Sequence, residues 1–429
     1  MSTQEKVIWR LKSGLDRRFR SGHPWAYSNE LQASPKGIRP GDRVELHDAG
    51  GKFLARGYGS PVSLIAFRAL TRDETFAEPL SVDGLRKTLA RASRLREGLG
   101  LASTSHRLCF GEADRLPGLV IDRFKLADSR DVLVAQAHTA GAERMLEDLP
   151  EALASLLGAK AWAKATFLVR NDLPVRKLEG LEEEQTARAL HGDLGGLEEA
   201  EILVATASGS EPLRFTADLK SGQKTGFFLD QAANTRLAAR ELEPAIGKRV
   251  RILDLCCYVG QWSTQLASHI LKSRPGREVE VTAFDSSARA LELARRNIER
   301  AGAKCETIKG DVLVDLASMT TGSYDIVVCD PPALIKGRKD IPQGKHAYLQ
   351  LNTQAVRLVR PGGFLLTSSC SALLEEEDFL ASIGKAARRN GTDLRLIARG
   401  SQSPDHPMLP EFPEGRYLKS WIGAVVPSL

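Results

Sequence analysis

The stretch Arg251-Ile-Leu-Asp-Leu-Cys-Cys-Tyr-Val-Gly260 predicts the fold of the C-terminal half of the chain. Residues 250–255 form a short run of apolar and β-branched side chains, which is typical of a buried strand. Gly260 closes the following turn, and apolar residues return at helical spacing over residues 261–271. The stretch therefore indicates a strand, a tight turn and a helix, with Asp254 at the carboxyl end of the strand.

Aspartates end four successive predicted strands, as Asp254, Asp285, Asp311 and Asp330. Open α/β sheets bind ligands at the carboxyl ends of their strands. The turn after Asp254 lacks the G-x-G-x-x-G pattern of dinucleotide sites, whereas S-adenosylmethionine (SAM) has no phosphate and fits better. We expect Asp254 near its ammonium group, Asp285 at its ribose and Asp311 at its adenine amine. Further residues expected at the cofactor are Asp230, Tyr258, Gly260, Ser286 and Val312.

The organisation of the chain follows from its patterns of strands and helices. Their alternation from residue 250 to 368 predicts a mostly parallel Rossmann-like sheet with helices on both faces, and residues 394–398 and 417–426 are expected as a closing antiparallel pair. The N-terminal segment is β-rich, with a strand expected at residues 62–69. A helix over residues 142–157 and a strand over 161–169 belong to a central α+β block. Three domains are expected: 1–75, 76–200 and 201–429.

Composition narrows the class of protein only moderately. The 429 residues carry a formal net charge of +6, which suits an anionic partner without requiring one. The sequence has no apolar run of the roughly 18 residues that a membrane span needs and no signal-peptide pattern, so a cytoplasmic protein is expected. None of the six cysteines has C-x-x-C spacing, so we expect no metal site.

The N-terminal segment carries basic residues beside aromatic ones. Arg17, Arg18 and Arg20 are followed directly by His23 and Trp25. Contacts to phosphates combined with base stacking are what looped or single-stranded RNA requires, so we assign these residues to RNA binding. The alternative is a solvated charged face, with Trp25 packed in a small core.

The sequence Asp330-Pro-Pro332 follows an apolar strand and places a carboxylate where a reacting base would lie. The two prolines restrict φ and stiffen the loop. Downstream, Lys336, Arg338 and Lys339 form a basic stretch that we assign to RNA phosphates, together with Lys224 in a polar, glycine-bearing loop. The alternative for the basic stretch is a mobile, solvated loop.

Cys370 ends the predicted strand of residues 363–368 in the sequence Thr-Ser-Ser-Cys-Ser. Carbon 5 of a pyrimidine is a poor nucleophile, but a thiolate added to carbon 6 turns the ring into an enamine. A cysteine at a strand end beside a methyl donor suits this chemistry, and the alternative is a small apolar residue that closes the core. Cys329 precedes Asp330 and is expected to face the core, whereas Cys256 and Cys257 lie in the cofactor turn.

Several motifs together resemble one family over nearly the whole chain. They include Gly22-His-Pro-Trp25, Gly111-Glu-Ala-Asp-Arg-Leu-Pro-Gly118, Gly222-Gln-Lys-Thr-Gly-Phe-Phe-Leu-Asp-Gln231, Thr367-Ser-Ser-Cys-Ser371 and Pro413-Glu-Gly-Arg-Tyr-Leu-Lys419. The chain resembles the RlmI-type class I SAM-dependent methyltransferases, which modify carbon 5 of a cytosine in 23S ribosomal RNA. The resemblance implies an N-terminal PUA domain, a central α+β domain and a Rossmann-like methyltransferase domain, with Cys370 as the nucleophile and Asp330 as the acid that binds the base.

Two features depart from the expected pattern. Ala333 follows the Asp-Pro-Pro motif where the family usually has Lys or a similar polar residue. Many RNA cytosine-carbon-5 methyltransferases outside this family carry a second cysteine beyond the Asp-Pro pair, which assists release, and this chain has none there. The group that removes the proton from carbon 5 therefore stays open, with His406 a weak candidate. Methylation of uridine carbon 5 or of an exocyclic amine, and a non-catalytic RNA-binding assembly factor, are alternative functions. A homodimer is compatible with the sequence.

Overall fold

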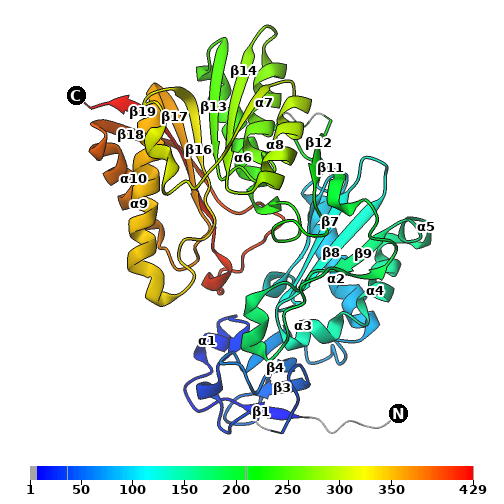
Figure 1. The fold of residues 1–429 in the computed structure, drawn as a ribbon. Helices are drawn as coiled ribbons and strands as arrows, with labels where there is room; N and C mark the ends of the chain where they lie inside the picture. Colours follow the sequence, from blue (N-terminus) through cyan, green and yellow to red (C-terminus); the bar gives the residue numbers. More distant parts are fainter. Residues whose placement is uncertain (1–6, 36, 208, 210, 429) are drawn as a thin grey trace. The chain divides into compact units, whose positions relative to one another are not determined.

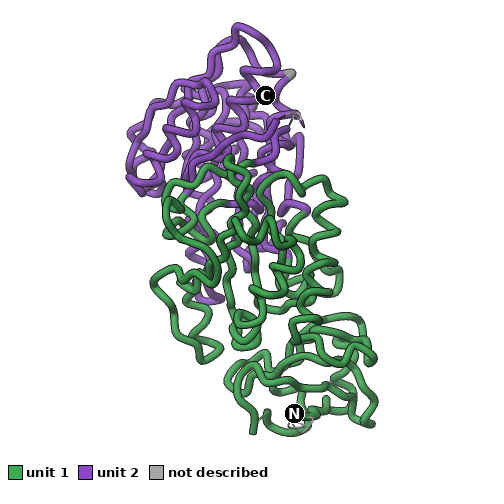
Figure 2. Tube along the Cα trace, turned by 90° about the vertical axis from the view of Figure 1, so that its right-hand side faces the viewer, with its two compact units in different colours: residues 1–203, 218–227, 405–415 green, residues 204–217, 228–404, 416–429 purple. Residues whose placement is uncertain are grey.

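The computed structural model describes residues 7–428 except residues 36, 208 and 210, and the chain forms two compact units. The first unit holds residues up to 203, 218–227 and 405–415, and the second holds residues 204–217, 228–404 and those from 416 onward (Figure 2). Strands β11 (Ala200–Val204) and β12 (Leu213–Ala217) carry the chain from one unit to the other. Two short segments from the later sequence thus return to the first unit.

A seven-stranded sheet organises the second unit, in the order β15-β14-β13-β16-β17-β19-β18. Its strands are β13 (Arg249–Leu255), β14 (Glu278–Asp285), β15 (Lys304–Lys309), β16 (Tyr324–Cys329), β17 (Val359–Ser369), β18 (Thr392–Gly400) and β19 (Lys419–Pro427). The first five run parallel, and β19 is antiparallel to both β17 and β18. The predicted parallel α/β sheet and its closing antiparallel pair are confirmed.

Helices cover both faces of this sheet (Figure 1). They are α6 (Ala232–Leu242), α7 (Gln261–Ser273), α8 (Ala288–Arg300), α9 (Ile341–Leu358) and α10 (Glu376–Arg389). Successive side chains of a strand point to opposite faces, so Ile252 packs with α6, α7 and α8 while Leu253 packs with α9 and α10. Cys329 is fully buried in the second of these cores, which confirms that it faces away from Asp330.

The first unit contains two five-stranded sheets that share part of a core. The N-terminal sheet has the order β1-β3-β4-β5-β2 and the central sheet β10-β9-β8-β7-β6. Tyr58 of β4 is buried in the core of the central sheet, where its hydroxyl donates to the carbonyl of Pro117 at 2.8 Å. The strands are β1 (Ile8–Arg10), β2 (Trp25–Ala26), β3 (Arg43–His47), β4 (Phe53–Gly59), β5 (Phe67–Thr71), β6 (His106–Phe110), β7 (Leu119–Lys125), β8 (Asp131–Ala137), β9 (Thr166–Val169) and β10 (Arg188–His191).

Three predicted elements of the first unit were wrong in their bounds. The helix expected over residues 142–157 is two helices, because Pro150 starts a new one and lacks the N–H that would continue the first. The strand expected from residue 161 begins only at Thr166, after a helical turn. The strand expected from residue 62 begins at Phe67, and Leu64 is 80% exposed. The helices are α1 (Arg17–Arg20), α2 (Val82–Gly98), α3 (Ala140–Met145), α4 (Leu149–Leu157) and α5 (Ala159–Trp162).

The two returning segments are anchored to the central sheet by buried polar contacts. The hydroxyl of Thr225 donates to Asp122 at 2.6 Å, and Asp122 also accepts two hydrogen bonds from Arg107. Asp405 accepts from the backbone N–H of Arg107 at 2.8 Å. Charge-assisted bonds of this kind are stronger than neutral ones, which explains why these segments belong with the first unit. No helix among the described residues is long and apolar enough to cross a membrane.

Candidate active site

The candidate residues lie at the carboxyl ends of five neighbouring strands. Asp311 follows β15, Asp285 ends β14, Asp254 lies near the end of β13, and Asp330 and Cys370 follow β16 and β17. The strands lie side by side in this order. All five strands are parallel, so these ends share one edge of the sheet. Asp311, Asp285 and Asp254, which are expected at the cofactor, therefore occupy one half of the edge (the cofactor half). Asp330 and Cys370, which are expected at the base, occupy the other half (the reaction half).

Asp254 is buried at the end of β13 and accepts a hydrogen bond from the backbone N–H of Ser263 at 3.1 Å. Burial raises the pKa of its carboxyl to about 7, and the negative charges of Asp330 and Asp285 act in the same direction. The Ser263 bonds oppose this shift. Because the carboxylate is costly without a counter-charge, this position favours a cationic group such as an ammonium.

The turn after β13 has an unusual backbone. Cys256 (φ 58°), Tyr258 (φ 49°) and Gly260 (φ 74°) all adopt left-handed conformations. Such values cost non-glycine residues free energy and are common at ligand sites. A Cβ atom on Gly260 would also lie 3.2 Å from side-chain carbons of Ala294 and Ile298, so the position needs glycine for space as well as for conformation.

Asp285 holds this turn in place. One carboxylate oxygen accepts from the N–H of Tyr258 and the other from the N–H of Ser287, both at 2.9 Å. Each carboxylate oxygen has a second lone pair, which suits hydroxyl groups of a ribose. Ser286, beside it, is exposed.

Asp311 and Asp230 have more local contacts. Asp311 is exposed, and its carboxylate accepts from the N–H of Leu313 at 2.8 Å, so it also stabilises its own turn. Val312 is half-buried against the α9 face of the sheet. Asp230 is buried, and its carboxylate accepts from the Tyr417 hydroxyl at 2.8 Å. The roles of these residues at the cofactor stay predictions.

Two side chains that sequence reasoning missed hold Asp330. Its Oδ2 atom accepts from the Gln231 amide at 2.8 Å and from the Trp262 indole N–H at 2.9 Å. The Gln231 carbonyl in turn accepts from Asn234 at 2.6 Å, which orients the amide so that its NH₂ group faces Asp330. Gln231 ends one of the family motifs and Trp262 follows the cofactor turn, but nothing in either motif indicates a common partner.

Cys370 directly follows β17 and is half-buried. Its sulfur lies 3.9 Å from the carbonyl oxygen of Pro331, so it is next to the loop that begins at Asp330. The neighbouring Ser371 Oγ accepts from the N–H of Ile335 at 3.1 Å, which ties the two loops together a second time. The nucleophile and the acid named by the sequence are therefore brought to adjacent loops.

The other five cysteines occupy buried or half-buried positions. Cys109, Cys257 and Cys329 are buried, and burial raises the pKa of each thiol above its ordinary value. Cys256 and Cys305 are half-buried, and burial raises their thiol pKa values too, that of Cys305 to about 12. Thiols of this kind are poor nucleophiles near neutral pH.

The three arginines that the sequence assigns to RNA binding near the N-terminus differ in their contacts within the protein. Arg17 is exposed, and Arg20 is exposed but pairs with Asp16 and Asp48. The Arg18 guanidinium donates to both carboxylate oxygens of Glu30 at 3.1 Å. Arg18 therefore has a structural partner in addition to any contact with RNA.

Trp25 and His23 lie in an aromatic cluster with Phe412. The ring centroids of Trp25 and Phe412 are 4.7 Å apart in an edge-to-face arrangement, and the Trp25 indole donates to Glu112 at 2.8 Å. His23 is buried, and burial lowers the pKa of its imidazole, with Arg18 acting in the same direction. Trp25 is half-buried and lies outside the core of the N-terminal sheet, so the roles of both residues in RNA binding stay predictions.

Lys224, Lys336, Arg338 and Lys339 are exposed. The last three lie just beyond Pro331, on the loop that Ser371 anchors through Ile335. Lys224 lies in the first unit, in the segment held by Thr225, and has a left-handed φ of 52°. His406, also in the first unit, is buried with its Nδ1 atom 3.0 Å from Asp405, the local contact of a structural histidine.

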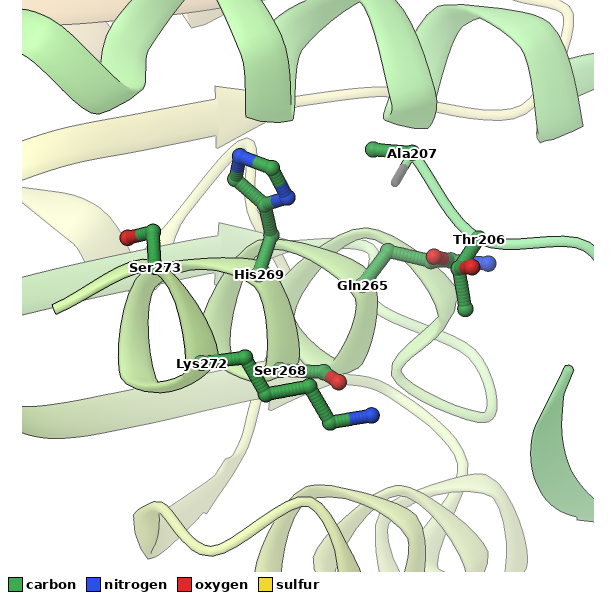
Figure 3. A pocket seen from close by; sticks show the side chains of 7 residues that line it. All are labelled: Thr206, Ala207, Gln265, Ser268, His269, Lys272 and Ser273. Atoms are coloured by element: carbon green, nitrogen blue, oxygen red, sulfur yellow. The ribbon is translucent and has the colours of Figure 1, made fainter. Parts of the chain in front are cut away.

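A small pocket of about 120 Å³ lies elsewhere in the second unit, along α7 (Figure 3). It is lined by Thr206, Ala207, Gln265, Ser268, His269, Lys272 and Ser273. None of the predicted site residues lines it. Among the described residues, no group of three or more His, Cys, Asp or Glu side chains has the arrangement of a metal site.

Comparison with known families agrees with this layout. A PUA-like domain model matches residues 10–72, and a methyltransferase domain model matches residues 246–409. Two solved structures share the fold across both units at 17% identity and a TM-score of 0.74. One is a Streptococcus mutans protein described as a SAM-dependent methyltransferase, with 97% of this chain and 100% of that chain covered. The other is a methyltransferase in complex with SAH, with 98% and 99% covered.

Curated relatives span nearly the whole chain. Ribosomal RNA large subunit methyltransferase I from Aeromonas hydrophila is 34% identical over 96% of this chain and 98% of its own length. The proteins of the same name from Klebsiella pneumoniae and Photobacterium profundum are 33% and 32% identical, over 97% and 96% of this chain and 98% and 97% of their own lengths. By this full-length similarity, the chain belongs to the family of ribosomal RNA large subunit methyltransferase I.

Proposed function

We propose that the protein transfers a methyl group from SAM to carbon 5 of a cytosine in large-subunit (23S) ribosomal RNA, through a covalent adduct with Cys370. The names of the full-length relatives and the PUA-like domain support ribosomal RNA as the substrate. The observation that carries the mechanism is the contact of the Cys370 sulfur with the Pro331 carbonyl, 3.9 Å away. It puts a thiol beside the loop of Asp330, at the sheet edge that also bears the cofactor residues.

The half of the edge around β13 and β14 fits the cofactor. Asp254 is a buried acid suited to the ammonium group, and Asp285 has lone pairs for ribose hydroxyls while it holds the Tyr258 turn. The turn offers a single glycine, Gly260, and no cradle for phosphates. SAM supplies an electrophilic methyl group when it is bound at this edge.

The reaction uses Cys370 as the nucleophile. Its thiolate adds to carbon 6 of the cytosine, and carbon 5 gains the electron density of an enamine. After the methyl group has bonded to carbon 5, a base removes the proton from that carbon, and the electrons of the C–H bond re-form the ring double bond and expel the thiolate. Cys370 is thereby regenerated, and the product is 5-methylcytosine.

Asp330 binds the Watson–Crick edge of the base in this proposal. Its carboxylate accepts from the exocyclic amine of cytosine, a donor that uracil lacks. Gln231 and Trp262 are positioning residues, because both donate to one carboxylate oxygen of Asp330 and so fix the orientation of the carboxylate. The exposed Lys336, Arg338 and Lys339 on the same loop are placed to contact RNA phosphates.

RNA that contains 5-fluorocytosine tests the proposal. Fluorine replaces the proton of carbon 5, so elimination fails and the protein stays bonded to the RNA through Cys370. We expect a covalent complex that withstands denaturing gel electrophoresis, requires SAM and is lost in Cys370→Ala. Cys305→Ala is the matched control, because Cys305 is also half-buried but lies near the start of β15, which β14, β13 and β16 separate from β17 and Cys370. Active wild-type protein without any adduct would rule out the covalent mechanism.

The same RNA distinguishes the alternatives. Trapping by 5-fluorouridine instead of 5-fluorocytosine would identify uridine as the target. A Cys370→Ala protein with full activity would indicate methylation of an exocyclic amine, which needs no adduct. Absence of SAM binding by calorimetry would favour a non-catalytic assembly factor.

A further inference from the structure

Lys419 is a charged residue next to Cys370 that the proposed reaction does not yet use. It is the first residue of β19 and pairs in register with Ser369 of β17, the residue before Cys370. Lys419 is half-buried, and its ammonium group donates to the carbonyl oxygens of Ser371 at 2.8 Å and Leu374 at 2.7 Å. It therefore binds the turn directly after the nucleophile.

The residues on both sides of Cys370 are held by a second set of contacts. The buried Tyr348 hydroxyl lies 2.9 Å from Ser371 Oγ and accepts from Ser369 at 2.9 Å. Burial raises the pKa of the Tyr348 hydroxyl, so this group stays neutral. The network restrains the backbone around Cys370 but offers no positive charge to its sulfur.

The groups that interact electrostatically with the Lys419 ammonium group include Cys370. Burial lowers the pKa of the Lys419 ammonium group, while Glu375, Cys370 and Glu376 favour its charged form. Glu375 is exposed to solvent, and Glu376 pairs with Arg399. A thiolate at Cys370 would interact electrostatically with this ammonium group, which donates hydrogen bonds to two neutral carbonyls.

One contact acts in the opposite direction. The Cys370 thiol donates to the Pro331 carbonyl across 3.9 Å, and this bond is lost when the sulfur ionises. A thiol is a weak donor, so the loss is small compared with the attraction of a nearby ammonium group in partly desolvated surroundings.

We propose that Lys419 is a positioning residue for the nucleophile, which anchors the Ser371–Leu374 turn and offers its positive charge to the Cys370 sulfur, so that a larger fraction of Cys370 is thiolate at neutral pH. The inference rests on the proposed function, in which Cys370 is the nucleophile. Anchoring and charge are separable, because glutamine keeps hydrogen-bond donors without a charge, whereas arginine keeps the charge.

The test is the pH dependence of alkylation at Cys370. Wild type, Lys419→Gln and Lys419→Arg are treated with iodoacetamide over a range of pH, and modification is quantified for each cysteine peptide by mass spectrometry. We expect the midpoint for Cys370 to rise by about one pH unit in Lys419→Gln, so that alkylation at neutral pH slows roughly tenfold, and to change little in Lys419→Arg. The slow reaction of Cys305, whose thiol pKa is about 12, is the internal control for folding.

An unchanged Cys370 midpoint in folded Lys419→Gln would overturn the inference and reduce Lys419 to an anchor for the turn. In the methyl-transfer assay, the acidic limb of the pH profile should move with the alkylation midpoint. The two proposals can fail separately. Alkylation measures the Cys370 thiol directly, so it tests the role of Lys419 even if Cys370→Ala retains activity and Cys370 is not the nucleophile.

Discussion

The two halves of the sheet edge are held by different kinds of partner. At the cofactor half, Asp254 and Asp285 accept hydrogen bonds from backbone N–H groups of nearby turns. At the reaction half, Asp330 accepts from side chains of two other segments, and the turn after Cys370 is bound by Lys419 of β19. A hydrogen bond from a backbone N–H is kept when the side chain of the donor residue is replaced, whereas a hydrogen bond from a side chain is lost. Side-chain substitutions at the reaction half should therefore lower the rate of methyl transfer with little effect on SAM binding at the cofactor half.

The largest effect is expected at Cys370. Cys370→Ala should lower the rate of methyl transfer by a factor on the order of 10³ to 10⁴, because no other group provides the covalent route. SAM affinity, measured by calorimetry, should stay close to the wild-type value. A parallel loss of SAM binding would mean that the two halves of the edge are not independent.

The substitution Asp330→Asn should come next, with a loss of transfer rate of about 10²-fold. The amide keeps the shape of the side chain but loses the charge and one acceptor, so it binds the exocyclic amine of cytosine less well. Single-turnover kinetics on 5-fluorocytosine RNA would show slower adduct formation. Asp311→Asn serves as the comparison at the far end of the same edge, where the KM for SAM should rise but the rate of adduct formation at saturating SAM should change little.

Gln231→Leu removes one of the two side-chain donors to Asp330 and should lower kcat by roughly tenfold, the size expected when one hydrogen bond to a charged group is lost. The Trp262 bond remains, so the effect is smaller than that of Asp330→Asn. Steady-state kinetics with SAM and RNA varied separately would locate the change in kcat and in the KM for RNA. A rise confined to the KM for SAM would assign Gln231 to the cofactor half instead.

The smallest effect is expected from the titration of Asp254. Its carboxyl pKa of about 7 means that the free protein holds a proton there below neutral pH, and the ammonium group of SAM favours the ionised form. Binding then releases a proton, and affinity should rise roughly tenfold between about pH 6 and pH 8. Calorimetry in buffers of different ionisation enthalpy measures the released proton. In Asp254→Asn both the pH dependence and the proton release should disappear, and their persistence would contradict this assignment.

Prediction from the sequence succeeded where a property depends on neighbours along the chain. The apolar run and the turn at Gly260 predicted a strand and a helix, and alternation along the strand predicted that Cys329 faces the core. It was wrong where one residue changes the backbone locally, as at Pro150, which divides a predicted helix in two. Hydrophobic periodicity continues through such a residue, whereas backbone hydrogen bonding does not.

The sequence by itself determined the acids at the strand ends, the nucleophile candidate and, through its motifs, the family. The tertiary structure alone revealed that Gln231 and Trp262 converge on one oxygen of Asp330 and that Lys419 binds the turn after Cys370. These contacts join residues that are 48, 68 and 99 positions apart in the sequence. Their meeting depends on the order of strands in the sheet. Parallel pairing brings the ends of β13 and β16 to one edge, and antiparallel pairing brings the start of β19 beside the end of β17, while the sequence records only their separate positions.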